Sequence, residues 1–165
     1  MRHSMIREPL LFLTFLAAAG MPASGAPSPA PTTLATTDGE RQGTRIEVTE
    51  LKRTSGGTLS LKFAMVNDSD KSLGFGYDFG SPDNHIGDHG TVGGITLVDP
   101  VNKKKYFVVR DSENKCVCSS DLKDISKGSR ANLWAKFPAP PGNVGKITIV
   151  VPHFAPMDDV PIANP

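Results

Sequence analysis

The chain has 165 residues, with 18 Lys and Arg, 17 Asp and Glu, and a formal net charge of +1 at pH 7. Arg2, Arg7 and Glu8 lie near the start, so the remainder carries 16 charges of each sign and is neutral. Non-specific binding to nucleic acid or to a membrane surface depends on positive charge, so the composition argues against both partners. The 16 Gly and 14 Pro suit short strands joined by turns.

Residues 1–25 have the layout of a secretory signal peptide. Arg2 and Arg7 precede an apolar run over residues 10–19, and small residues at positions 23–26 provide a cleavage site. The apolar run is about half the ~20 residues that a membrane-spanning helix needs. We therefore expect a secreted, extracellular or periplasmic protein with no transmembrane segment after signal cleavage.

Residues 26–43 are rich in Pro, Thr and Ala and lack apolar periodicity. Such a stretch buries too little surface to offset its ordering entropy, which predicts a flexible linker. Residues 44–165 are then predicted to form one folded domain, and a chain of this length is sufficient for a single hydrophobic core.

Within this domain apolar and polar residues alternate with a period of two, which indicates half-buried strands. The clearest case is residues 59–65, while in residues 45–53 the phase slips near Glu50. The expected strands are residues 45–53, 59–65, 73–79, 95–98, 106–109, 131–137 and 146–151, with a short edge at Val160 and Ile162.

About seven strands at turn spacing, without helical periodicity, predict an all-β fold with antiparallel pairing. Two sheets packed face to face bury one face of every strand, so we expect an immunoglobulin-like antiparallel β-sandwich. A small closed barrel is the second architecture that fits the pattern. The Cys and Trp signature of antibody domains is absent, because the two cysteines are two residues apart.

Residues 94–106, followed by Arg110-Asp111, form a recognisable pattern together with Cys116-Val-Cys-Ser119 and with residues 133–141. This pattern resembles bacterial secreted immunoglobulin-like domains, the class of the mycobacterial immunoprotective extracellular antigen. Similar domains also lie N-terminal to OmpA-type envelope domains. The resemblance covers roughly residues 44–162 and implies an extracytoplasmic binding or structural module, with no catalytic residues to transfer.

Cys116 and Cys118 are the sharpest chemical feature of the sequence. In an oxidising compartment an isolated pair tends to close into a disulfide, here a small ring that would fasten the surrounding polar loop. The alternatives are a labile, redox-active bond, metal binding by the two thiolates, and disulfides between chains.

A second cluster contains His85, Asp88 and His89 in a Gly-containing polar loop. Imidazole and carboxylate groups are ligands for transition metals, so these three residues form a candidate metal site. A solvated polar loop explains the same residues, and the sequence indicates no cofactor.

Lys103, Lys104 and Lys105 lie at the tip of the predicted hairpin, where they are candidates to bind an anionic envelope polymer or lipid. Lysines on a strand edge also protect the edge against aggregation. Trp134 is expected to belong to the core, with Phe63 and Phe137, rather than to a ligand platform.

No nucleophile–base arrangement is visible, so we do not expect an enzyme. The sequence predicts a non-enzymatic secreted or periplasmic module of the cell envelope that contacts an unknown protein or envelope component. Loops carry function on rigid sandwiches, so loops 81–94 and 111–128 are the expected contact surface. The alternative function is a redox-active or metal-handling extracytoplasmic protein that uses Cys116 and Cys118 or His85 and His89.

Overall fold

The computed structural model describes residues 32–74, residue 79 and residues 89–165. The predicted signal peptide, most of the strand expected at 73–79, and the candidate metal ligands His85 and Asp88 lie outside the described residues.

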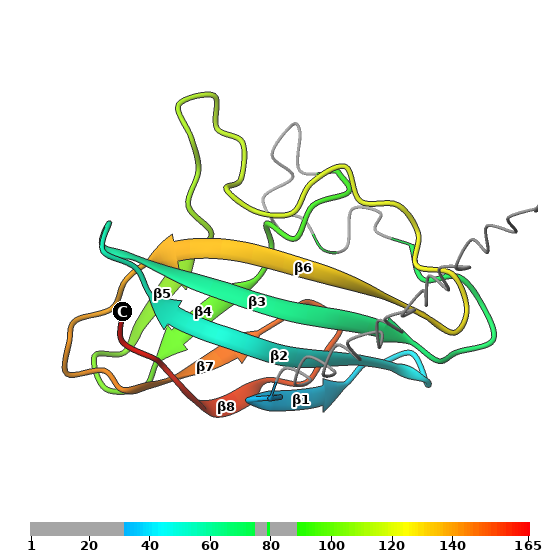
Figure 1. Ribbon diagram of the computed structural model, residues 1–165, viewed down its shortest axis with the longest axis horizontal. Coiled ribbons are helices and arrows are strands. Elements are labelled where there is room, and N and C mark those ends of the chain that lie inside the picture. Colours follow the sequence, from blue (N-terminus) through cyan, green and yellow to red (C-terminus); the bar gives the residue numbers. More distant parts are fainter. Residues whose placement is uncertain (1–31, 75–78, 80–88) are drawn as a thin grey trace, which may run out of the picture. The chain divides into compact units, whose positions relative to one another are not determined.

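The described chain forms two antiparallel sheets of four strands each, in the orders β1-β2-β3-β6 and β5-β4-β7-β8 (Figure 1). The all-β sandwich is therefore confirmed, with eight strands rather than about seven, and the sheets stay open instead of closing into a barrel. The strands are β1 (Ala35–Asp38), β2 (Thr44–Arg53), β3 (Thr58–Asn67), β4 (Thr96–Asp99), β5 (Lys104–Phe107), β6 (Ser129–Pro138), β7 (Lys146–Val150) and β8 (Met157–Pro161).

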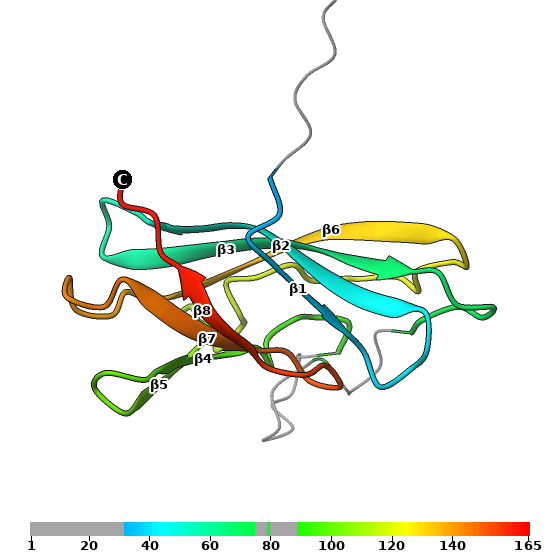
Figure 2. The ribbon, with the colours of Figure 1, turned by 90° about the horizontal axis from the view of Figure 1, so that it is seen from below.

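The strand order is that of an immunoglobulin-like sandwich. Strands β2, β3 and β6 lie side by side as strands A, B and E do in that fold, and β4, β7 and β8 follow the order C, F and G. Strand β5 is added beside β4 and β1 is added beside β2. Figure 2 shows the two layers from the side, with β2, β3 and β6 in one layer and β4, β5, β7 and β8 in the other.

The core lies between the layers because each strand turns alternate side chains inward. On β6, Leu133, Ala135 and Phe137 are buried while their neighbours face outward. The largest fully buried side chains are Phe137, Ile46, Leu51, Leu59, Leu61, Met65, Ile95, Leu97, Ile147, Ile149, Val48 and Val92. Burial of these apolar side chains is the main source of stability for the fold.

The phase slip that the sequence shows near Glu50 corresponds to an irregularity in the pairing of β2 with β3. Val48 pairs with Phe63, whereas Glu50 pairs with Lys62, so the register shifts by one residue between Val48 and Glu50. An extra residue in one strand lets Val48 and Leu51 both face the core although three positions separate them.

The prediction of a flexible linker through residue 43 is wrong over its last part, because residues 35–38 form β1. This strand pairs with β2 in register from Ala35 opposite Val48 to Asp38 opposite Arg45. Backbone hydrogen bonds to β2, and packing of Ala35 against the core, order a segment that has little apolar patterning. The folded domain therefore begins before Thr44.

Irregular segments cover two strand edges of the sandwich. The backbone N–H of Arg53 donates to Ala163 O and that of Ala163 donates to Leu51 O, both at 2.9 Å. The C-terminal residues therefore cover the part of the β2 edge that lies beyond its pairing with β1. At the other side of this sheet, Val117 O accepts the backbone N–H of Lys136 on β6 at 3.0 Å. Covered edges have few free backbone groups to pair with other chains.

Candidate functional site

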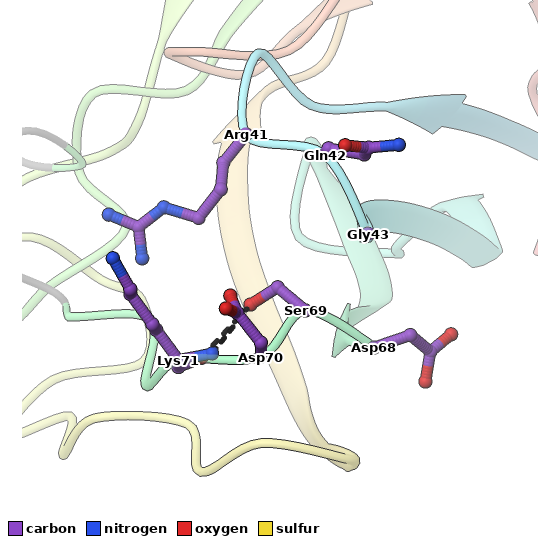
Figure 3. Close-up of a pocket in the computed structure, with 7 residues that line it drawn as sticks. All are labelled: Arg41, Gln42, Gly43, Asp68, Ser69, Asp70 and Lys71. Atoms are coloured by element: carbon purple, nitrogen blue, oxygen red, sulfur yellow. Dashed lines mark hydrogen bonds between the residues drawn. The ribbon is translucent and has the colours of Figure 1, made fainter.

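Three connections come together at one end of the sandwich: β1–β2, the start of β3–β4, and β7–β8. The first two line an open pocket of about 660 Å³, drawn in Figure 3, and all three contribute to a neighbouring pocket of about 160 Å³. Arg41 lines both. These pockets form the candidate site, and we refer to this part of the molecule as the loop end.

Gly43 fixes how the first two connections meet. It adopts a φ of +80°, which glycine tolerates and other residues rarely adopt. A Cβ at this position would lie 2.9 Å from the backbone of Ser69, and Gly43 O accepts the N–H of Asp68 at 2.7 Å. The close approach of the two loops therefore requires a residue without a side chain.

Asn67 organises the β3–β4 connection from inside the fold. Its side chain is fully buried, and its Oδ1 accepts hydrogen bonds from the N–H and the hydroxyl of Ser69. Its Nδ2 donates to Lys71 O and to Ile125 O, each at 2.8 Å. A buried amide with all these partners holds the loop in one conformation, so the pocket wall is preorganised.

The larger pocket presents two exposed cations. Figure 3 shows that the side chains of Arg41 and Lys71 extend toward the same side of the pocket. The Arg41 guanidinium donates to Ser72 O at 2.9 Å, and among the described residues neither cation forms an ion pair. Asp68 lines the same pocket but is paired with Arg45 at 2.7 Å. Within the described part of the chain, the pocket thus presents two cations without an ion-pair partner, beside the exposed Asp70.

The smaller pocket has an imidazole at its rim. His153 Nδ1 lies 3.1 Å from a Glu40 carboxylate oxygen, and the N–H of Glu40 donates to His153 O at 2.9 Å. The ring of Phe79 meets the His153 ring edge to face, with centroids 5.9 Å apart. His153 has a φ of +67°, a conformation uncommon for residues other than glycine. These contacts join the β1–β2 and β7–β8 connections.

The described parts of the two predicted contact loops pack against each other. Leu122 N–H donates to Gly90 O at 2.9 Å, and Val92 N–H donates to Ser119 O at 3.3 Å. Leu73, which lines the smaller pocket, pairs with Ile125 through two backbone hydrogen bonds of 2.9 Å. Parts of loops 81–94 and 111–128 therefore support the loop end, and residues 81–88 lie outside the described residues.

Cys116 and Cys118 are joined by a disulfide, with Cα atoms 5.3 Å apart. The disulfide-bonded segment folds back on the residues that follow β5, where Val117 N–H donates to Val109 O at 2.7 Å. It also lies along β6, where Ser119 N–H donates to Trp134 O at 2.9 Å. The Cys118 side chain is buried and that of Cys116 is partly exposed, so the bond fastens the segment that covers the β6 edge.

Of the three candidate metal ligands, His89 is described and exposed, while His85 and Asp88 lie outside the described residues. Within the described parts of the chain, no group of three or more His, Cys, Asp or Glu is placed to hold a metal ion. The candidate metal site therefore stays a prediction.

Lys103, Lys104 and Lys105 lie where the hairpin was expected, with Lys103 in the turn and the other two on β5. All three are exposed. The turn is held by the buried carboxylate of Asp99, which accepts hydrogen bonds from the backbone of Val101 and from the backbone and side chain of Asn102.

The expectation that Trp134 belongs to the core is wrong, because 40% of it is exposed. The alternation on β6 that buries Leu133, Ala135 and Phe137 places Trp134 on the opposite face of the sheet, opposite Lys62 of β3.

Sequence reasoning did not identify Arg41, Lys71 or Asn67 as parts of a site. A Gly followed by a strand, and Asn two positions before Ser, were visible signals of turns. Nothing local indicated that these turns, roughly 30 residues apart, share one pocket.

Comparison with protein-family models, curated proteins and solved structures finds no match. No helix in the described part of the chain is long and apolar enough to cross a membrane.

Proposed function

We propose that this chain is an exported, non-enzymatic binding module of the cell envelope that engages its partner through the loop end. The observation that carries the proposal is the open pocket with preorganised walls that presents Arg41 and Lys71, neither of which forms an ion pair with another described residue. Loops on a rigid sandwich are a recurring place for binding sites. A partner with anionic groups matches the positive charge of these two side chains.

Two features of the chain support an extracytoplasmic location. The N-terminal sequence has the layout of a secretory signal, and the cysteine pair forms a disulfide. Disulfides persist mainly in oxidising compartments such as the periplasm and the extracellular space. The resemblance to secreted immunoglobulin-like domains points to the same location.

Export is tested by the intact mass of the protein purified from periplasm and culture medium. We expect an N-terminus near Ala26 and alkylation of the cysteines only after reduction. An uncleaved chain recovered from the cytoplasm would contradict export.

Binding is tested by co-sedimentation of the purified domain with isolated cell envelopes from its host. The double variant Arg41→Ala/Lys71→Ala should weaken binding by at least about threefold, since each exposed ionic contact contributes modestly. Lys52→Ala/Lys146→Ala removes the same charge elsewhere and serves as the control. Equal loss in both double variants would show that overall charge, rather than the loop end, governs binding.

A second candidate function, thiol–disulfide exchange, rests on the disulfide between the partly exposed residue Cys116 and buried Cys118. Attack by an external dithiol on the Cys116 sulfur would form a mixed disulfide and release Cys118 as the leaving thiolate. Reduction by stoichiometric dithiothreitol at neutral pH, followed by thiol titration, separates the two functions. Rapid reduction would support thiol–disulfide exchange, whereas resistance of the bond would reject it and leave the binding module as the proposed function.

A further inference from the structure

Strand β5 is the edge strand of the second sheet, and no described segment pairs with its outer side. Its described backbone partners belong to β4, from Thr96 opposite Phe107 to Asp99 opposite Lys104. The β6 edge, in contrast, carries the disulfide segment, and β2 carries β1 and the C-terminal residues. Alternate N–H and C=O groups of an edge strand point away from the sheet, where they can pair with another extended chain.

The β5 edge also exposes an apolar surface. Phe107 is 61% exposed and Val101, in the adjoining turn, is 59% exposed. Phe107 lies on the outer face beside Thr96, which in turn neighbours Val150 of β7. Lysines alone would protect this edge against aggregation, so edge protection does not explain the exposed aromatic ring of Phe107.

Lys103, Lys104 and Lys105 give the same edge a strong positive charge. Among the described residues none of the three forms an ion pair. Asp99, the carboxylate beneath them, is already occupied by the backbone and side-chain donors of the turn. The three ammonium groups are therefore available to an incoming partner.

From these three features we propose that β5 is a docking edge for an extended, acidic peptide segment of a partner protein, which adds a strand beside Lys104–Phe107. Main-chain hydrogen bonds supply the pairing, and side chains at alternate positions supply the selectivity. Lys105 and Phe107 share the outer face, so the matching segment carries an acidic residue beside Lys105 and, two positions away on the same face, an apolar residue beside Phe107.

A second copy of this chain is disfavoured as the occupant. Antiparallel pairing of two β5 strands places six lysines along one short strand pair, and this accumulation of like charge disfavours self-association. The hairpin tip lies at the opposite end of the sandwich from the loop end (Figure 1), so this edge is a second surface, separate from the pockets.

The test uses the folded domain, residues 26–165, and a capped peptide that repeats Glu-Thr-Val-Thr, so that Glu and Val alternate along one face, followed by backbone NMR. We expect shifts at residues 104–107 and no shifts at residues 41–43. A peptide of the same sequence with N-methylated central amides keeps its charge but cannot donate backbone hydrogen bonds, and we expect it to bind at least about tenfold more weakly.

Two variants divide the proposed contacts. Lys104→Gln/Lys105→Gln should weaken peptide binding by about threefold or more, and Phe107→Thr should weaken it while keeping the strand propensity. Lys52→Gln/Lys146→Gln is the matched control and should leave binding unchanged.

Equal binding of the plain and N-methylated peptides would overturn strand addition. Polyphosphate or vesicles with anionic lipid that shift residues 103–105 as strongly, with Phe107→Thr unaffected, would also overturn the proposal and assign the lysines to a polyanion. Absence of any peptide binding would leave the lysines as a guard of the edge and reject a docking role.

Discussion

Asp99 is a charged side chain buried completely at the end of β4. Burial by itself raises the pKa of its carboxyl group. The hydrogen bonds from the Asn102 side chain, and from the backbone N–H groups of Asn102 and Val101, outweigh burial and hold the pKa below its ordinary value. Burial and the nearby Asp99 carboxylate together raise the pKa of the Tyr106 hydroxyl. The turn that presents the three lysines is thus organised around one carboxylate.

A carboxyl group whose pKa is lower in the folded than in the unfolded state stabilises the fold in its ionised form. The contribution of Asp99 should be complete above its unfolded pKa of 3.8 and should be lost as the pH falls through the lower folded pKa. Asp99→Asn should therefore destabilise the domain at pH 7 and reduce the loss of stability between pH 4 and pH 2. Urea unfolding followed by circular dichroism at several pH values measures both effects.

The matched control is Asp70→Asn, which removes an exposed carboxylate at the loop end. It should leave the pH dependence close to that of the wild type. If Asp99→Asn and the wild type lost stability in parallel below pH 4, the carboxylate of Asp99 would not be the group that responds to acid.

At the scale of an element, the disulfide segment acts as an irregular cover for β6. It contributes an acceptor to Lys136 N–H through Val117 O and a second acceptor to Trp134 N–H through the Ser119 hydroxyl, at 3.0 and 2.9 Å. The bond between Cys116 and Cys118 closes a very short loop, so it constrains the unfolded chain little. Its effect should be local.

We therefore predict that Cys116→Ala/Cys118→Val lowers the free energy of unfolding by less than about 2 kcal/mol. Valine preserves the apolar contact that buried Cys118 makes with the core. The backbone amides of Trp134 and Lys136 should nevertheless exchange hydrogen faster, while β3 amides paired to the other side of β6 should not. Hydrogen exchange read by NMR separates these groups, and unchanged exchange at Lys136 would show that the cover holds without the bond.

At the scale of the whole molecule, the sequence predicts those elements that its own periodicity defines. The alternation of residues 59–65 and 131–137 specified β3 and β6, two neighbouring strands of the first sheet, and the phase slip at Glu50 indicated the irregularity in β2. Strand β1 was missed because its residues Ala35–Asp38 carry no apolar alternation. Its order comes from backbone pairing with β2, which no local pattern reveals.

The candidate site was less accessible to sequence reasoning for the same physical reason. Arg41 and Lys71 belong to different connections, and their proximity depends on Gly43 and Asn67 acting across the fold. The Arg53 guanidinium likewise donates to the carbonyls of Pro140, Pro141 and Val144, about 90 residues away along the chain. A single sequence gives the residue types for such contacts but not the partners.

The C-terminal residues join the two sheets. After β8 leaves the second sheet, Ala163 exchanges two backbone hydrogen bonds of 2.9 Å with Arg53 and Leu51 of β2 in the first sheet. Ile162 packs against the core, and its N–H donates to Gly145 O at 2.9 Å. These contacts link β8, β2 and the β6–β7 connection, so their loss should weaken the sandwich as a unit rather than loosen one end.

Removal of residues 162–165 should therefore lower the free energy of unfolding by about 2 to 4 kcal/mol, from the lost hydrogen bonds and the buried part of Ile162. Chemical denaturation should still show one transition, since both sheets share one core. Removal of residues 164–165 alone leaves Ala163 in place and is the control. A truncated domain with wild-type stability, or with a separate early transition confined to β8, would contradict this prediction. Either result would show that the two sheets are held together without the contacts of residues 162–165.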